Sequence, residues 1–279
     1  MTVCEVCDGA GAEVGYAGLR RCAACSHVWA DLSLDAEAIQ QLYQRSYFFG
    51  DEYGNYLDDR RIIEKNFAGR LATLRRFLTP IHRRLFEVGC AYGFFLNAAQ
   101  SSFESVRGID VSEDAARYAR EEFGLAVTSG DLLAADLTGQ ALDVACVWDT
   151  IEHLATPRRY LETLAAHMPA GSLLAITTGD IGSLNARFQK GRWRLIHPPT
   201  HLHYFTRQSL SQLLDRCGFR VVHVEYCGNY RSLGGMFHNL VGLRWGWPRL
   251  GGWLQRVTPQ GLDLYLNLHD IMYIVAERR

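Results

Sequence analysis

The chain has 279 residues, of which 48% are hydrophobic and 21% are charged. This composition supports one large domain, or a catalytic domain of about 200 residues with a small appendage, and excludes wholesale disorder. Lys and Arg number 29 and Asp and Glu number 30, for a formal net charge of -1. Proteins that bind nucleic acid by bulk phosphate attraction are usually basic, so the charge argues against a nucleic-acid partner.

The sequence also limits where the protein is expected to reside. No apolar run reaches the roughly 18 to 20 residues that a membrane helix needs. Residues 1–15 lack the basic segment and apolar segment of a secretory signal. We therefore expect a cytoplasmic protein without a membrane span.

Four of the eight cysteines stand as two Cys-x2-Cys pairs, namely Cys4 with Cys7 and Cys22 with Cys25. Together they supply four thiolates, the closed tetrahedral shell of a structural zinc site. We expect residues 1–30 to form a zinc ribbon around one structural Zn²⁺, with a redox dithiol pair or an iron–sulfur site as alternatives. His27 is expected at the surface and not as a further ligand.

Residues 31–80 are expected to connect the ribbon to the main domain. An aromatic stretch at 47–56 precedes a helix that the apolar spacing predicts over 60–78. The aromatic residues would cover a bound cofactor, or pack the ribbon against the main domain.

From residue 85 onward, short apolar runs alternate with helix-like segments. The runs occupy residues 85–88, 105–110, 125–129, 142–149, 172–178, 219–226 and 271–277. Their spacing predicts an α/β domain over residues 81–279, with a doubly wound, mostly parallel, seven-stranded sheet. We expect the last run to add a strand at the edge of this sheet.

A segment at 230–262 is inserted before the last predicted strand. It combines tryptophans with arginines, and Gly242, Gly246 and Pro248 would break a long amphipathic helix. We expect a lid over an apolar acceptor or a homodimer contact through this segment.

The first predicted strand runs into the loop Glu87-Val-Gly-Cys-Ala-Tyr-Gly93, which opens a helix. Glycines permit a tight turn and close approach of a ligand, and the helix N-terminus offers N–H donors. Asp110 and Asp131 end the next two strands. Ligands of open α/β sheets bind at these strand ends, so the three acidic groups should meet in one crevice. There Asp110 can accept hydrogen bonds from ribose hydroxyls, and Asp131 can meet an adenine amino group.

These motifs, taken in order, resemble those of class I S-adenosylmethionine-dependent methyltransferases. They are Glu87-x-Gly89-x-Ala91-x-Gly93, Asp110, Gly130-Asp131 and Asp149-Thr-Ile-Glu-His-Leu-Ala-Thr-Pro157. The resemblance implies a Rossmann-like fold, S-adenosylmethionine as methyl donor and S-adenosylhomocysteine as product. It assigns cofactor binding to Glu87, Gly89, Ala91, Gly93, Asp110, Val111, Asp131, Leu132 and Asp149. Ala91 departs from the pattern, since the family usually has glycine there. The competing dinucleotide-binding dehydrogenase would carry G-x-G-x-x-G, which this loop lacks.

Methyl transfer to oxygen or carbon also needs a base for the acceptor proton. Glu152 and His153 follow the fourth predicted strand, and His201 and His203 lie in the stretch 197–206. These four residues are the catalytic candidates, and we expect His201 and His203 to border the substrate pocket. Alternatively, Glu152 and His153 cap the next helix, and 197–206 is a packed loop. The sequence places no third acidic or cysteine ligand at useful spacing for a metal among these histidines.

The four-cysteine module, the aromatic stretch and the methyltransferase motifs together also resemble deoxysugar C-methyltransferases of natural-product pathways. In that group the module helps to close the substrate site. Its carboxy-terminal extra domain has no counterpart here. We therefore expect methyl transfer to oxygen or carbon of a small-molecule acceptor, sugar-like or a natural-product intermediate, assisted by histidine. The alternatives are an RNA or protein methyltransferase steered by the ribbon, and a non-catalytic cofactor-binding docking protein.

Overall fold

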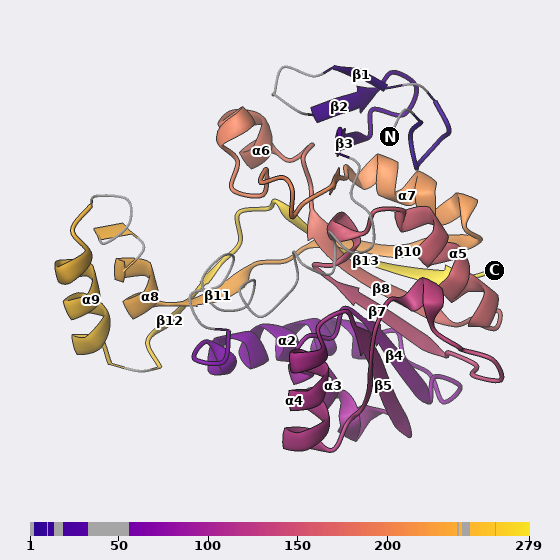
Figure 1. The fold of residues 1–279 in the computed structure, drawn as a ribbon, viewed down its shortest axis with the longest axis horizontal. Coiled ribbons are helices and arrows are strands. Elements are labelled where there is room, and N and C mark those ends of the chain that lie inside the picture. The colour runs from indigo at the N-terminus through magenta and orange to yellow at the C-terminus, as the bar shows by residue number, and fades with distance from the viewer. Residues whose placement is uncertain are drawn as a thin grey trace.

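The computed structural model describes residues 3–9, 11–13, 19–32, 56–238, 240–241, 246–259 and 261–279. A seven-stranded sheet with strand order β10-β13-β8-β7-β4-β5-β6 forms its centre (Figure 1). The strands are β4 (Arg84–Val88), β5 (Ser105–Asp110), β6 (Ala126–Ser129), β7 (Val144–Trp148), β8 (Leu173–Gly179), β10 (Phe219–Tyr226) and β13 (Ile271–Arg278). Strands β4 to β8 pair in parallel, and β13 is antiparallel to both of its neighbours. The predicted doubly wound, mostly parallel sheet is confirmed.

The last strand does not lie at the edge, so that expectation was wrong. β13 is inserted between β8 and β10, and β10 is the edge strand. The burial explains the order, because six of the eight β13 residues are buried while β10 is mostly half-buried. A strand that is apolar on both faces belongs in the interior of a sheet.

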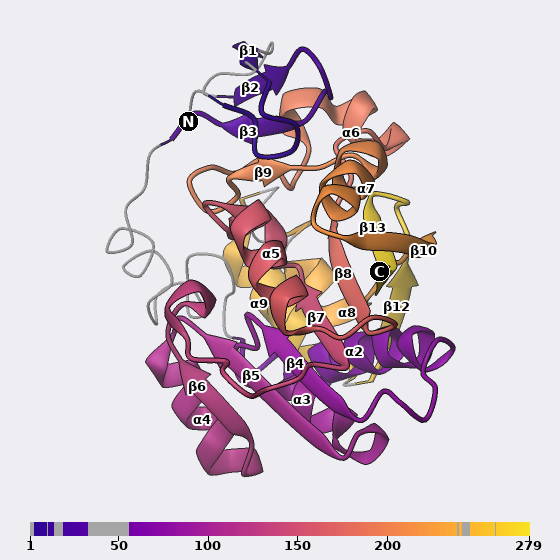
Figure 2. The same ribbon diagram turned by 90° about the vertical axis from the view of Figure 1, so that its right-hand side faces the viewer.

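Helices cover both faces of the sheet (Figure 2). On one face, α2 (Arg60–Arg75), α3 (Phe94–Ala99) and α4 (Glu113–Phe123) pack on a cluster that contains Leu85, Val144 and Cys146. On the other face, α5 (Pro157–His167) and α7 (Arg207–Arg216) pack on Phe86, Ala145 and Val147. Alternate strand residues therefore serve opposite faces, as the period of two of a β-strand requires.

The helix ends follow the sequence signals. The Ser112 hydroxyl accepts a hydrogen bond from Ala115 N, and Gly124 ends α4 at a φ of 64°. Thr206 begins α7 with a capping box to Ser209. The predicted helix after residue 60 ends at Arg75, three residues earlier than expected.

The cysteine module and the main domain share a four-stranded sheet. Its strands are β1 (Gly11–Glu13), β2 (Leu19–Cys22), β3 (Val28–Ala30) and β9 (His203–Tyr204), in that order. β3 pairs with β9, which lies in the histidine-rich stretch, and Figure 1 shows the module beside α6 (Leu184–Gln189) and α7. The module is thus hydrogen-bonded to the segment that carries two of the candidate histidines, His201 and His203, while the domain boundaries stay a prediction.

The inserted segment projects away from the sheet as a separate element (Figure 1). β11 (Asn229–Ser232) pairs with β12 (Asp263–Leu266), and α8 (Leu233–Phe237) and α9 (Pro248–Val257) lie between them. Pro248 is the first residue of α9, so the helix break predicted near it is confirmed. Arg61 Nη1 of α2 donates to Asp263 at 2.6 Å and anchors β12. The lid and the homodimer contact remain predictions.

In the part of the chain that the structure describes, no helix is both long and apolar enough to cross a membrane. Residues 33–55, which include most of the predicted aromatic cover, lie outside the described residues. Tyr56 is described; it is buried and stacks on Tyr92 and Phe94 beside the glycine loop.

Candidate active site

The loop between β4 and α3 turns through left-handed backbone conformations. The φ angles are 73° at Gly89, 44° at Ala91 and 77° at Gly93. A Cβ atom on Gly89 would lie 2.5 Å from the Thr150 hydroxyl, and one on Gly93 would lie 2.7 Å from a Leu125 methyl group. Both glycines are therefore required for close packing, whereas Ala91 tolerates a conformation that costs a non-glycine residue about 1 kcal/mol.

Two substitutions test this reading of the loop in opposite directions. Gly89→Ala should lower the free energy of unfolding by about 3 kcal/mol, because it adds both a clash and backbone strain. Ala91→Gly restores the family residue and should change stability by less than about 1 kcal/mol, since relief of strain offsets the greater freedom of the unfolded chain. Urea denaturation of both variants measures the difference. Equal stabilities would contradict the assignment of a strained, tightly packed turn.

Asp110 connects the glycine loop to the next strand end. One carboxylate oxygen accepts a hydrogen bond from Ala91 N at 2.7 Å, and the other accepts one from Ser112 N at 2.9 Å. Burial raises the pKa of this carboxyl, and the two N–H donors oppose that shift. Each oxygen keeps a lone pair for a further donor, so the geometry suits two ribose hydroxyls.

The neighbouring strand end carries Asp131, whose Oδ1 accepts from Leu133 N at 2.9 Å and from the Tyr160 hydroxyl at 2.7 Å. Tyr160 comes from α5, and nothing in the sequence pattern marked it as part of the site. Leu132 is buried and Val111 is half-buried, directly after Asp131 and Asp110. These residues line the strand ends at which the sequence placed a nucleoside.

Glu87 lies in β4, between β7 and β5, and close enough to Asp110 to be affected by its charge. It is 1% exposed, and its Oε2 has no hydrogen-bond partner among the described residues. Burial and the nearby charge of Asp110 raise the pKa of Glu87 well above its usual value. A buried polar atom without a partner costs about 1 to 3 kcal/mol, and the ammonium group of S-adenosylmethionine would supply the missing donor. The residues present therefore fit this cofactor.

Asp149, at the end of β7, is bound by two side chains. Arg70 Nη2 of α2 donates to Asp149 Oδ2 at 2.5 Å, and the Thr177 hydroxyl donates to Oδ1 at 2.9 Å. Burial alone would raise the pKa of Asp149, but the Arg70 charge brings it below its usual value. Arg70 and Asp149 line a cavity of about 220 Å³, together with residues that include Tyr56, Asn66, Tyr230 and Met236. The cavity lies between α2 and the β11–α8 segment.

The catalytic candidates Glu152, His153 and His201 come together. One ligand atom from each lies within 4.8 Å of those of the other two, and the His153 and His201 ring centres are 4.5 Å apart. Burial and the charge of Asp149 raise the pKa of Glu152 to about 8. Burial lowers the pKa of His153 to about 4 and also lowers that of His201. Both imidazoles are therefore neutral at pH 7.

His203 faces the cysteine module. Its Nδ1 is 3.0 Å from Nε2 of His27, and the two rings stack. His27 is 0% exposed, so its expected place at the surface was wrong. The β3–β9 pairing buries it between the ribbon and the main domain, a long-range contact that the ribbon sequence does not reveal.

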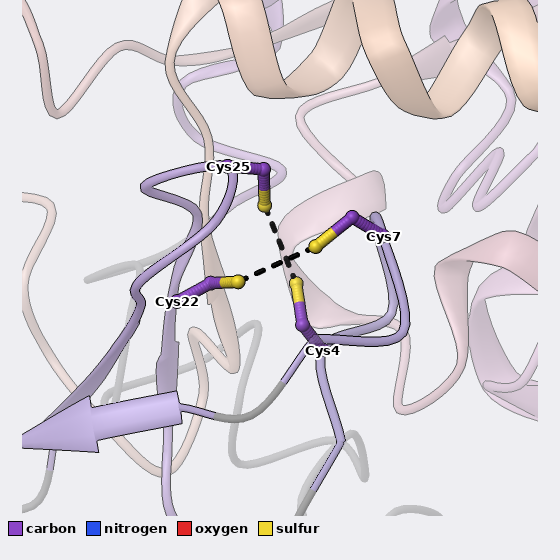
Figure 3. A group of neighbouring side chains, drawn as sticks. All are labelled: Cys4, Cys7, Cys22 and Cys25. Carbon is purple, nitrogen blue, oxygen red and sulfur yellow. Dashed lines mark hydrogen bonds between the residues drawn. The ribbon is translucent and has the colours of Figure 1, made fainter.

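The four cysteines of the module point toward one another (Figure 3). Sγ of Cys4 is 3.5 Å from Sγ of Cys25, and Sγ of Cys7 is 3.3 Å from Sγ of Cys22. All four are free thiols with ligand atoms within 4.8 Å of one another. Zn–S bonds of about 2.3 Å give S···S separations of about 3.8 Å in a tetrahedron. The donor set and its spacing therefore fit a structural zinc ion.

Comparisons with known proteins identify the family of this chain. The family model described as a methyltransferase domain matches residues 59–224. The chain belongs to this family.

A Mycobacterium tuberculosis protein named "Probable S-adenosylmethionine-dependent methyltransferase" is 26% identical over 151 residues, 54% of this chain and 53% of the relative. The chain thus matches about half the length of this curated relative.

Solved structures show the same fold. A Thermotoga maritima S-adenosylmethionine-dependent methyltransferase, named as a "possible histamine N-methyltransferase", covers 86% of this chain and all of its own, with 18% identity and a TM-score of 0.55. Magnesium protoporphyrin IX methyltransferase from Synechocystis, solved with S-adenosylhomocysteine bound, covers 88% of this chain and 100% of its own, with 14% identity and a TM-score of 0.56. The Rossmann-like methyltransferase fold is therefore established.

Proposed function

We propose that the protein transfers the methyl group of S-adenosylmethionine to oxygen or carbon of a small-molecule acceptor, sugar-like or a natural-product intermediate. The observation that carries the proposal is the unpartnered Glu87 carboxylate between the glycine loop and Asp110. A histidine cluster stands at the end of the adjacent strand β7. The proposed cofactor site and the proposed acceptor site thus lie at the same edge of the sheet.

The charges around the loop match both parts of the cofactor. Asp110 and Asp131 would bind the ribose and the adenine. The methionine part is a zwitterion, so its ammonium suits Glu87 and its carboxylate suits the buried Arg70. Arg70 lies near enough to lower the pKa of Glu87 by its charge, which supports binding of the two ends of the zwitterion by this pair.

Methyl transfer is an in-line displacement, so the protein's main tasks are to position the acceptor and to exclude water. An oxygen or carbon acceptor also loses a proton. In our proposal the Glu152–His153–His201 cluster assists this loss, because a neutral imidazole has a nitrogen lone pair that can accept a proton.

The ribbon supports our proposal of a sugar-like acceptor, because it is part of the resemblance to deoxysugar C-methyltransferases. β3 hydrogen-bonds to β9, and Ala30 N donates to Leu202 O at 2.8 Å, directly after His201. The module thereby borders the histidine cluster. A role in closing the acceptor side would follow from this position.

The test is an acceptor screen with nucleotide-linked deoxysugars and their keto forms. Mass spectrometry should detect S-adenosylhomocysteine together with a singly methylated acceptor. Incubation of a keto-sugar with enzyme and S-adenosylhomocysteine in D₂O separates the two chemistries. Deuterium uptake at the carbon beside the carbonyl indicates C-methylation, and its absence with turnover indicates O-methylation. Lack of any methylated small molecule would contradict the proposal.

His153→Ala should lower kcat by about 10² to 10⁴ and leave the affinity for S-adenosylhomocysteine unchanged, since His153 assists the acceptor and not the cofactor. His167→Ala is the matched control, because His167 also bonds a backbone carbonyl, Thr163 O, at 3.0 Å but lies on α5 away from the cluster. A wild-type kcat in His153→Ala would contradict a role of His153 in the reaction.

Two alternatives predict other results. An RNA or protein methyltransferase steered by the ribbon predicts tight, salt-sensitive RNA binding or protein methylation. Within residues 1–30 only Arg20 and Arg21 are strongly basic, and Arg20 is paired with Asp31 at 2.7 Å, which weakens the RNA alternative. A docking protein predicts cofactor binding without turnover and no loss of biological activity in alanine variants of His153, His201 and His203.

A further inference from the structure

Glu152, His153 and His201 form a ligand set that the sequence order hides. Glu152 and His153 belong to a turn of 3-10 helix, η4 (Ile151–His153), directly after β7. His201 comes from the loop before β9. In the described part of the chain, the groups of three or more metal-binding side chains close enough to share an ion are this one and the four ribbon cysteines. The sequence around His201 contains no acidic ligand, but the fold brings Glu152 beside it.

Hydrogen bonds to backbone carbonyls orient both histidine rings. Nδ1 of His153 is 2.8 Å from the Thr200 carbonyl oxygen, and Nδ1 of His201 is 2.9 Å from that of Leu195. A carbonyl only accepts, so Nδ1 of His201 carries the proton and its Nε2 carries the lone pair, while His153 is oriented by its bond to Thr200. Metal-binding histidines are typically oriented by such a bond from the opposite nitrogen.

The third group is held just as firmly. The Thr178 hydroxyl donates to Glu152 Oε2 at 2.8 Å, and Leu202 N donates to the Glu152 carbonyl oxygen at 2.8 Å. The second bond ties the His201 loop to η4. The three side chains thus keep their mutual position without a covalent link.

We propose that Glu152, His153 and His201 bind one divalent first-row transition-metal ion, in addition to the ribbon zinc. Two imidazoles and a carboxylate suit Zn²⁺, Fe²⁺, Mn²⁺ or Co²⁺, whereas Mg²⁺ and Ca²⁺ prefer oxygen ligands. The ligand atoms of these three residues lie within 4.8 Å of one another, and metal–ligand bonds of about 2.1 Å would draw them closer together. Three protein ligands leave coordination positions for an acceptor oxygen.

This inference deepens the proposed function and rests on it for the role of the ion. A bound divalent ion lowers the pKa of an oxygen that it contacts. The histidines would then assist the acceptor through the ion's charge, with no redox change and no further co-reactant.

Cobalt binding tests the site without any turnover. The full-length protein is first washed with EDTA, and elemental analysis confirms that it keeps one ribbon zinc per chain. Calorimetric titration with Co²⁺ should then show one further ion per chain. The cobalt spectrum should lack the intense sulfur charge-transfer band of a cysteine site.

Variants locate the ion. His201→Ala and Glu152→Gln should each weaken Co²⁺ binding at least tenfold, and His167→Ala should leave it unchanged. Thermal melts check that each variant folds, and the wild-type titration decides the question if one does not. The proposal is overturned by wild-type protein that takes up no further Co²⁺, by a sulfur charge-transfer band, or by equal affinity in wild type and a folded ligand variant. Cobalt binding without methyl transfer would contradict only the proposed function. Methyl transfer by wild-type protein that binds no cobalt would contradict only the metal site.

Discussion

Asp110→Ala is expected to weaken the binding of S-adenosylmethionine and S-adenosylhomocysteine by about 3 kcal/mol, roughly a hundredfold in Kd. Both oxygens of Asp110 are oriented by backbone donors, from Ala91 and Ser112, and in our proposal each accepts a hydrogen bond from one ribose hydroxyl. The loss of two hydrogen bonds to a charged acceptor sets the magnitude. Isothermal titration calorimetry with S-adenosylhomocysteine measures it.

Asp114→Ala is the control for this prediction. Asp114 lies four residues away, in the first turn of α4, and its side chain is 42% exposed and paired with Arg117. Its removal should leave the affinity within about twofold of wild type. An Asp110→Ala protein that melts cooperatively and binds with wild-type affinity would show that the ribose lies elsewhere.

Removal of the ribbon zinc is expected to abolish most activity, although the cysteines lie outside the crevice. Cys25→Ser should release the ion, and a module this small folds only with its metal. Loss of β3 would then remove the partner of β9, which begins two residues after His201. We expect at least a tenfold fall in kcat, with the affinity for S-adenosylhomocysteine nearly unchanged, because Glu87 and Asp110 belong to the seven-stranded sheet and β9 belongs to the four-stranded sheet.

Cys227→Ser provides the matched control. Cys227 is a free, half-buried thiol outside the four-cysteine cluster, so its substitution should keep both zinc and activity. Elemental analysis and steady-state kinetics on the two variants are the measurements. Wild-type kcat in zinc-free Cys25→Ser would show that the ribbon does not support the acceptor side.

Local signals explain why much of the fold could be predicted. Apolar runs located all seven strands, and Ser112 and Gly124 marked the two ends of α4. The cofactor crevice was also foreseeable, because carboxyl ends of parallel strands must meet at one edge of the sheet. Glu87 and Asp110 therefore came together as expected.

The features that escaped prediction depend on contacts between distant residues. His27 is buried because β3 pairs with β9. This pairing brings His27 against His203, which is 176 residues later in the sequence. Tyr160 reaches Asp131 across the α5 face. Likewise, no spacing rule joins Glu152 to His201, since α5, β8 and α6 lie between them and only the loop that carries His201 folds back on η4. The position of β13 reflects burial on both faces, which a short apolar run does not distinguish from an edge strand.

The central claim is that the crevice formed by Glu87, the glycine loop and Asp110 binds S-adenosylmethionine. Isothermal titration calorimetry of the purified wild-type protein tests it most directly. We predict that S-adenosylmethionine and S-adenosylhomocysteine each bind once per chain with micromolar affinity. Failure of both to bind to folded, zinc-loaded protein would contradict the account and favour a docking role.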